Sequence, residues 1–232
     1  MSERIDIPTD DGAMPAFRFL PESGSGPGIV LFQEIFGVTD YIKDRATDLA
    51  ALGYVVLVPE FYWRLGDAEI DYSRDDVLQQ AMGLMGRLDW ETAVADGIAA
   101  VAAARADEHV DGGVGVFGFC FGGGLAFNVA AATDVDVLVS YYGSALPNLL
   151  HLADSVTAPS LHHFGLADDY LPADVVERIR NAVARDGVRF ETYDGAGHAF
   201  DNPDPMFHHA EASAAAWRAT VDFLRTELPV AP

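Results

Sequence analysis

The chain has 232 residues, half of them hydrophobic, which suits one domain with a full-sized core over residues 1–232. Thirty-six acidic residues against fourteen basic ones give a formal net charge of −22 at pH 7. This charge repels nucleic-acid phosphates and anionic lipid, so we expect neither nucleic acid nor membrane as a partner. No apolar run has the length of a membrane-spanning helix, and no signal peptide is recognisable, so we expect a cytoplasmic protein.

The predicted elements alternate between strand and helix. The first is an antiparallel hairpin that contains Ile5, Ile7 and residues 15–20 and turns at residues 10–12. Further strands are predicted at 28–32, 54–58, 114–118, 137–141, 160–164 and 189–193, and helices at 40–52, 73–88, 89–105, 122–132, 173–186 and 206–227. Continuous apolar strands indicate burial on both faces, which predicts a mostly parallel sheet of about eight strands with helices on both faces.

Two connections stand out. Residues 59–72 (PEFYWRLGDAEIDY) are aromatic and irregular, which indicates either a lid over a pocket or a packed surface loop. Residues 111–113 (Asp-Gly-Gly) are typical of a turn that leads into the strand at 114–118.

That strand runs into Gly118-Phe119-Cys120-Phe121-Gly122, the spacing of the nucleophile elbow of α/β-hydrolases with cysteine in place of serine. A Cβ at Gly118 or Gly122 would clash in such a turn, and strain in φ is expected at Cys120. The following helix N-terminus would favour the thiolate. A glycine-rich turn could equally hold a phosphate, and lone cysteines are often buried hydrophobes, so this segment alone leaves the alternatives open.

An elbow of this kind needs an acid and then a histidine later in the chain. Asp168 follows the strand at 160–164, and His198 follows the strand at 189–193, so both lie at the carboxyl edge of the sheet with Cys120. Asp169 competes with Asp168 for the acid role. The order predicts Cys120 as nucleophile, His198 as base and Asp168 as the residue that fixes the imidazole.

The cysteine has no disulfide partner because it is the single one in the chain. The pairs His162-His163 and His208-His209 lack further ligands at zinc-site spacing. We therefore expect no metal and no other cofactor.

Four segments together resemble the dienelactone hydrolase (carboxymethylenebutenolidase) family, and the similarity extends over nearly the whole chain. They are Gln33-Glu34-Ile35-Phe36-Gly37, the elbow at 118–123, the loop at 165–172 and Gly197-His198-Ala199-Phe200. The resemblance implies a single-domain α/β-hydrolase fold and selects Asp168 over Asp169 as the acid.

The resemblance also implies roles that spacing alone does not give. Glu34 would hold the resting thiol of Cys120 and swing away when substrate binds, and a nearby carboxylate does disfavour a thiolate by like-charge repulsion. The backbone N–H groups of Ile35 and Phe121 would form the oxyanion hole.

The resemblance implies that the substrate is a small-molecule ester or lactone, and we expect it to be cleaved through an acyl-cysteine intermediate. In the family, enzymes that cleave dienelactone grip the substrate carboxylate with arginines, one of them four residues after the histidine. Here that residue is Asn202, and Arg64, Arg74 or Arg87 are the candidates to substitute from the lid side. The candidate substrate-binding residues are Phe36, Asn202, Tyr62, Trp63 and Arg64. The alternatives are a general carboxylesterase or thioesterase, or a non-catalytic binding protein, and in each case a monomer or small homo-oligomer.

The acidic residues are spread through helices and loops, and Lys43 is the one lysine among the fourteen basic residues. A GC-rich genome would explain the missing lysine but not so large an acidic excess. Self-repulsion of dispersed carboxylates weakens in high salt, so we expect a halophilic enzyme.

Overall fold

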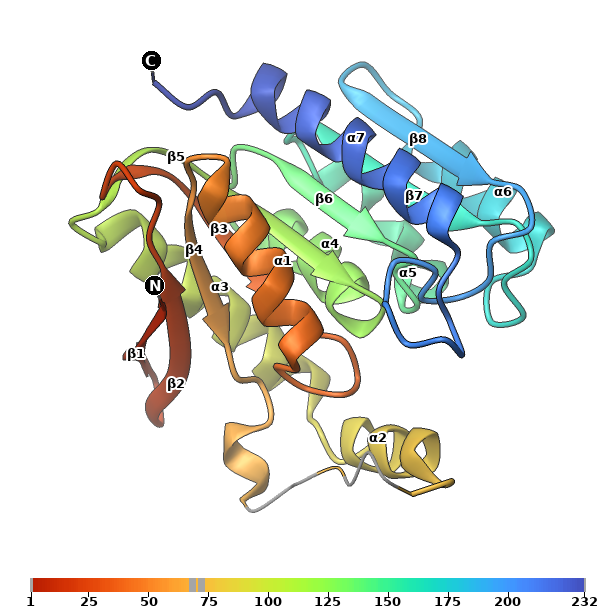
Figure 1. Ribbon diagram of the computed structural model, residues 1–232, viewed down its shortest axis with the longest axis horizontal. Helices are drawn as coiled ribbons and strands as arrows, with labels where there is room; N and C mark the ends of the chain where they lie inside the picture. Colours follow the sequence, from red (N-terminus) through yellow and green to blue (C-terminus); the bar gives the residue numbers. More distant parts are fainter. Residues whose placement is uncertain (1, 67–69, 71–73, 232) are drawn as a thin grey trace.

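The computed structural model describes residues 2–66, 70 and 74–231 and contains an eight-stranded sheet (Figure 1). The strand order is β1-β2-β4-β3-β5-β6-β7-β8. The hairpin strands are antiparallel, and β4, β3 and the strands beyond them pair in parallel. The strands are β1 (Ser2–Thr9), β2 (Gly12–Phe19), β3 (Gly26–Phe32), β4 (Val55–Pro59), β5 (Val110–Phe119), β6 (Leu138–Tyr141), β7 (Ser160–Gly165) and β8 (Val188–Tyr193).

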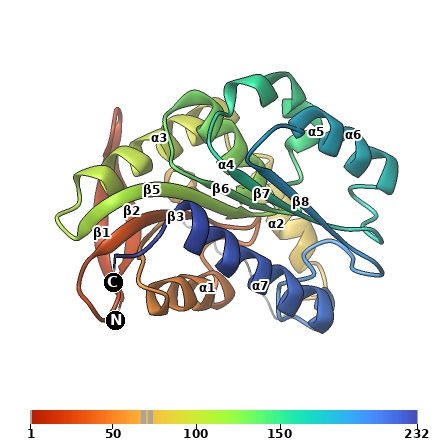
Figure 2. The ribbon, with the colours of Figure 1, turned by 90° about the horizontal axis from the view of Figure 1, so that it is seen from above.

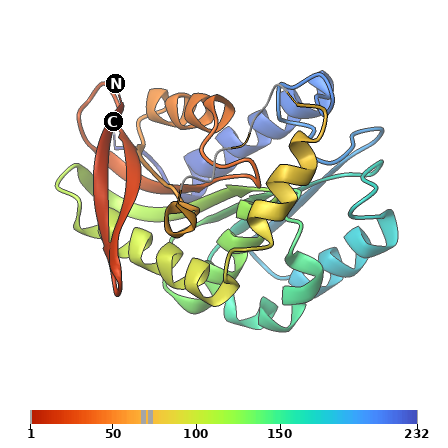
Figure 3. The same ribbon diagram turned by 90° about the horizontal axis from the view of Figure 1, so that it is seen from below.

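Helices cover both faces of the sheet. In Figure 2, α1 and α7 lie on one face and α3, α4 and α6 on the other, which confirms the predicted α/β architecture. The α-helices are α1 (Asp40–Ala51), α2 (Val77–Met85), α3 (Trp90–Ala106), α4 (Phe121–Ala132), α5 (Leu146–Leu149), α6 (Ala173–Val183) and α7 (Ala210–Glu227), with 3₁₀ turns at η1 (Trp63–Leu65) and η2 (Leu150–Ser155). Helix α2 stands apart, in front of the central strands when the molecule is seen from below (Figure 3).

The local sequence explains the central elements. Every residue of β3 and β4 is buried, as expected for apolar strands covered on both faces. Thr39 caps α1 by accepting a hydrogen bond from the backbone N–H of Ile42, and Asp89 caps α3 through Thr92. The predicted starts of these two helices are therefore confirmed to within a residue.

The predicted turn at residues 111–113 is wrong, because β5 already begins at Val110. The glycines allow close packing instead. A Cβ on Gly112 would press on Pro27, and one on Gly113 would meet Asp136 and Leu228 at 2.8 Å.

The last helix begins at Ala210 and not at residue 206. The side chain of Asp204 accepts a hydrogen bond from the backbone N–H of Met206, and such local turns compete with helix formation. The sequence prediction also missed α5 and η2. Helix α2 starts at Val77, whereas the helix start predicted at Ser73, and residues 67–69 and 71–72 of the predicted lid or loop, lie outside the described residues.

Across residues 2–66, 70 and 74–231, no helix combines the length and the apolar character that crossing a bilayer requires.

Candidate active site

Cys120 lies on the sharp turn between β5 and α4. Its backbone has φ 53° and ψ −114°, in the region that side chains rarely adopt, which confirms the expected strain. A Cβ on Gly118 would collide with the carbonyl group of Gly122, and a Cβ on Gly122 would collide with the backbone of Phe32 and Gln33. The predicted need for both glycines is confirmed, because backbone and not flexible side chain occupies the space.

Three side chains from separate strand ends form a hydrogen-bonded chain. Cys120 Sγ lies 3.0 Å from His198 Nε2, and His198 Nδ1 lies 2.7 Å from Asp168 Oδ2. The other oxygen of Asp168 accepts hydrogen bonds from the backbone N–H groups of Tyr170 and Leu171, so the carboxylate is fixed. Asp168 is buried whereas Asp169 is exposed. The geometry allows a proton to pass from the thiol to the imidazole.

The electrostatics of His198 suit that transfer. Burial by itself lowers the pKa of His198, but the charge of Cys120 and the hydrogen bonds with Asp168 and Cys120 outweigh burial and hold this pKa well above its usual value. The imidazole can therefore keep a proton taken from the thiol at neutral pH.

Ile35 and Phe121 line the same cavity as Cys120. Phe121 is the first residue of α4, where backbone N–H groups have no acceptor within the helix. Ile35 lies in a turn closed by a hydrogen bond from Gly37 N to Glu34 O, and Tyr62 donates a hydrogen bond to the Ile35 carbonyl. The structure therefore brings both residues predicted for the oxyanion hole to the wall of the cavity that contains Cys120.

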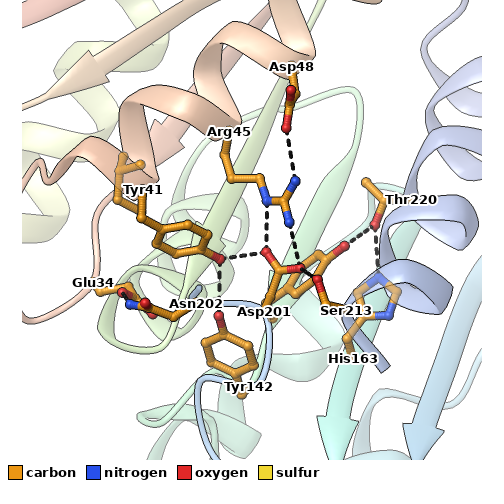
Figure 4. Close-up of polar contacts among 12 residues, drawn as sticks. Glu34, Tyr41, Arg45, Asp48, Tyr142, His163, Asp201, Asn202, Ser213 and Thr220 are labelled. Carbon is orange, nitrogen blue, oxygen red and sulfur yellow. Dashed lines mark hydrogen bonds and ion pairs between the residues drawn. The ribbon is translucent and has the colours of Figure 1, made fainter. Parts of the chain in front are cut away.

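Glu34 is buried at the edge of the cavity, with 1% of its surface exposed. Its Oε2 accepts a hydrogen bond from Asn202 Nδ2 at 2.8 Å (Figure 4), and Oε1 has no partner among the described residues. Burial raises the pKa of Glu34 to about 7, against the lowering effects of Asn202 and His198. The hydrogen bonds found for Cys120 Sγ go to His198 and, at 3.9 Å, to Ser144, so the structure does not bring Glu34 onto the thiol.

The cavity has a volume of about 400 Å³ and a mostly apolar wall to which α2 contributes. Among the described residues that line it, none is arginine or lysine. The lining consists of Glu34, Ile35, Phe36, Leu78, Met82, Met85, Leu88, Trp90, Cys120, Phe121, Ser144, Ala145, Asn148, Tyr170, His198, Ala199 and Phe207.

Of the residues predicted to bind substrate, the structure brings Phe36 to this cavity. Arg64 forms ion pairs with Asp11 and Asp96 instead, and Trp63 donates its indole N–H to Asp96. Tyr62 supports the Ile35 turn from behind, and Asn202 holds Glu34.

The other two arginines considered also have partners elsewhere. Arg74 pairs with Asp76, and Arg87 donates a hydrogen bond to the carbonyl of Leu65. Neither is part of the described lining of the cavity.

Sequence reasoning missed Tyr142 and Ser144. Tyr142 has φ 37°, is fully buried, and its ring centroid lies 5.3 Å from that of His198. Both residues follow β6 at the carboxyl edge of the sheet, so the rule that located Asp168 and His198 could have found them.

An ion pair between a partly buried arginine and a buried aspartate supports the loop that carries His198. Asp201, 1% exposed, accepts hydrogen bonds from Arg45 Nε and Nη2 at 2.8 Å each, from Tyr41 at 2.6 Å and from Ser213 at 2.7 Å (Figure 4). Burial alone lowers the pKa of Arg45, but Asp201 outweighs it and raises this pKa above its usual value. The loop is thereby tied to α1 and α7.

The described residues contain no group of three or more histidine, cysteine, aspartate or glutamate side chains placed to hold a metal ion.

The parallel sheet and the elbow with its histidine and aspartate define an α/β-hydrolase. The sequence profile of the "Dienelactone hydrolase family" matches residues 14–228. The carboxymethylenebutenolidase of Pseudomonas sp. (strain P51) is 36% identical over 94% of this chain and 92% of its own length, and that of Pseudomonas putida is 34% identical over 97% and 96%. The chain belongs to the dienelactone hydrolase family.

Solved structures agree with this assignment. A dienelactone hydrolase-like protein from Klebsiella pneumoniae subsp. pneumoniae MGH 78578 superimposes with a TM-score of 0.84 at 26% identity, covering 96% of this chain and 97% of its own. The dienelactone hydrolase-like promiscuous phosphotriesterase P91, from metagenomic libraries, gives 0.82 at 26% identity, covering 100% and 99%.

Proposed function

We propose that this ester or lactone hydrolase works through an acyl-cysteine intermediate on Cys120. The observation that carries the proposal is the 3.0 Å contact between Cys120 Sγ and His198 Nε2 at the wall of an apolar cavity. A thiol paired with a partly buried, oriented imidazole is the arrangement that activates a cysteine nucleophile.

The reaction has two halves. His198 takes the thiol proton, and the sulfur attacks the ester carbonyl carbon, whose oxygen becomes negative and is bound by the N–H groups of Ile35 and Phe121. The carbon–oxygen bond breaks as His198 returns its proton to the leaving alkoxide. Water then attacks the acyl-cysteine while His198 takes a proton from it. The carbon–sulfur bond breaks, His198 returns the proton to the Cys120 sulfur, and the carboxylic acid leaves. Asp168 keeps the imidazole oriented throughout.

Mass spectrometry of the intact protein tests this mechanism. After rapid mixing with p-nitrophenyl butyrate, we expect a mass increase of one butyryl group that maps to the peptide containing Cys120. Steady hydrolysis with no adduct on Cys120, or with an adduct on another residue, would contradict the mechanism.

We infer that the substrate is uncharged. Asn202 stands where related enzymes carry an arginine, and the described cavity lining contains no arginine or lysine. We expect kcat/KM for the anionic dienelactone to be lower than for neutral aryl esters by about tenfold or more, because a carboxylate loses its charge-assisted hydrogen bonds. Initial rates with both substrates decide the question, and a preference for dienelactone would refute it.

We propose that Glu34 restrains the thiolate of Cys120 through its charge. With a pKa of about 7, Glu34 is mostly neutral below neutral pH and charged above it. The variant Glu34→Gln should therefore match the wild type at acidic pH and react faster with iodoacetamide above pH ~7, where the like charge is missing. The exposed Glu22→Gln variant is the matched control. This role would be contradicted if the ratio of the alkylation rates of Glu34→Gln and wild type were the same at every pH, or if Glu34→Gln were alkylated more slowly than the wild type.

We propose a cytoplasmic protein adapted to high salt, on the basis of its net charge of −22. The melting temperature should rise from 0.1 M to molar potassium chloride, because the Debye length falls from about 10 Å to about 3 Å. Sucrose is the control, since it favours apolar burial without screening charge. A flat or falling melting temperature in salt, or an equal rise in sucrose, would leave genome composition as the reason for the acidic excess.

A further inference from the structure

A second cavity of about 600 Å³ adjoins the one that contains Cys120. The two cavities share three lining side chains, namely Phe36, Leu78 and Phe207. The rings of Phe36 and Phe207 lie 6.1 Å apart, centroid to centroid, and are inclined by 46°. These three apolar side chains therefore form a partition between the reacting atoms and the second space, which no step of the proposed mechanism uses.

The second cavity has a preformed polar wall. Tyr41 and Asn202 line it and are almost completely buried, with 8% and 9% of their surfaces exposed. The Tyr41 hydroxyl donates to Asp201, and the Asn202 amide donates to Glu34 (Figure 4). Asn202 Oδ1 accepts a hydrogen bond from the backbone N–H of Asp204. Because both side chains are held by partners behind them, the wall does not have to form when a ligand enters.

The charges around the second cavity disfavour an anion. Its charged lining residues among those described are Asp40 and Asp204, both acidic, and its apolar lining includes Val38, Val77 and Met206. Lys43 lies 3.7 Å from Asp40 and offsets part of that charge, but it is not in the lining. A neutral chain can pack on the apolar side chains without meeting like charge, whereas a carboxylate would be repelled.

We propose that the second cavity binds the tail of an extended ester without negative charge, whose carbonyl group lies at Cys120. This inference rests on the proposed function and adds the shape of the substrate. The catalytic cavity holds the compact half, and the tail passes the Phe36–Phe207 partition. Together the two cavities reach the upper part of the size range of small-molecule sites, about 1,000 Å³.

Filling the second cavity tests the proposal. Val77→Trp places an indole there from α2, and Val38→Trp does so from the loop after β3. The probes are p-nitrophenyl butyrate, p-nitrophenyl decanoate and the decanoate analogue whose chain ends in a carboxylate. The matched control is Val188→Trp on the edge strand β8, outside both cavities.

In both cavity variants we expect the ratio of kcat/KM for decanoate to kcat/KM for butyrate to fall about tenfold. The change should come mainly from a higher KM for decanoate. A tenfold loss corresponds to about two methylene groups that are no longer buried. The control should keep the wild-type ratio. The wild type should also prefer decanoate over its carboxylate-ended analogue. An unchanged ratio in both variants, equal losses on both esters, or indifference to the terminal carboxylate would overturn the inference and leave the proposed function intact. A wild-type enzyme that does not hydrolyse p-nitrophenyl butyrate would overturn both this inference and the proposed function.

Discussion

Replacing Cys120 by alanine is expected to lower turnover of p-nitrophenyl butyrate by about 10⁶-fold, the scale of loss when the nucleophile of a triad is removed. Alanine can adopt the backbone conformation of residue 120 about as well as cysteine, and its side chain is smaller, so we expect the variant to fold. The melting temperature and circular dichroism spectrum of the variant check the fold, and stopped-flow or long-time assays measure residual turnover. Retained hydrolysis in a folded Cys120→Ala protein would show that another group attacks the ester.

The second large effect concerns stability. The variant Arg45→Met is expected to lose about 3–5 kcal/mol of unfolding free energy, because it leaves the carboxylate of Asp201 buried without its cation. In the structure Asp201 has no exposed side-chain surface, and Arg45 supplies two of its hydrogen bonds. Urea unfolding followed by tryptophan fluorescence gives the difference.

The matched control is Arg105→Met. Arg105 pairs with Asp136 at 3.0 Å, but both side chains are about two-fifths exposed, at 41% and 43%. Exposed pairs contribute about 0–1 kcal/mol, so this variant should unfold close to the wild type. Similar losses in both variants would mean that the burial of Asp201 does not set the contribution of this ion pair to stability.

The sequence located Cys120, Asp168 and His198 because chain order and strand ends carry the needed information. A parallel sheet brings the carboxyl ends of its strands to one edge, so residues far apart in sequence can be assigned to one site without knowing any contact. The structure brings these three side chains within hydrogen-bond distance.

The substrate-binding residues were harder to predict, because composition does not tell which way a loop side chain points. Arg64 looks like a carboxylate ligand in the sequence, yet it is needed to neutralise the buried Asp96. Asn202 binds Glu34 because the fold brings together two loops that are far apart in the sequence, and the sequence alone does not show this contact. Likewise Gly112 and Gly113 are typical of a turn in the sequence. In the structure they leave room for Pro27 and Asp136, which pack against the strand at these positions.

The elbow fixes the backbone of the nucleophile independently of the side chain that carries out the chemistry, and this has a consequence for evolution. The position of residue 120 is set by the glycines at 118 and 122 and by a hydrogen bond from its own backbone N–H to the Tyr141 carbonyl. None of these constraints depends on the side chain at 120. A change in one codon can therefore exchange a thiol for a hydroxyl while these backbone contacts of residue 120 are inherited unchanged. A lineage with this sheet can change its nucleophile in a single step, whereas the loss of either glycine would require the backbone itself to be rebuilt.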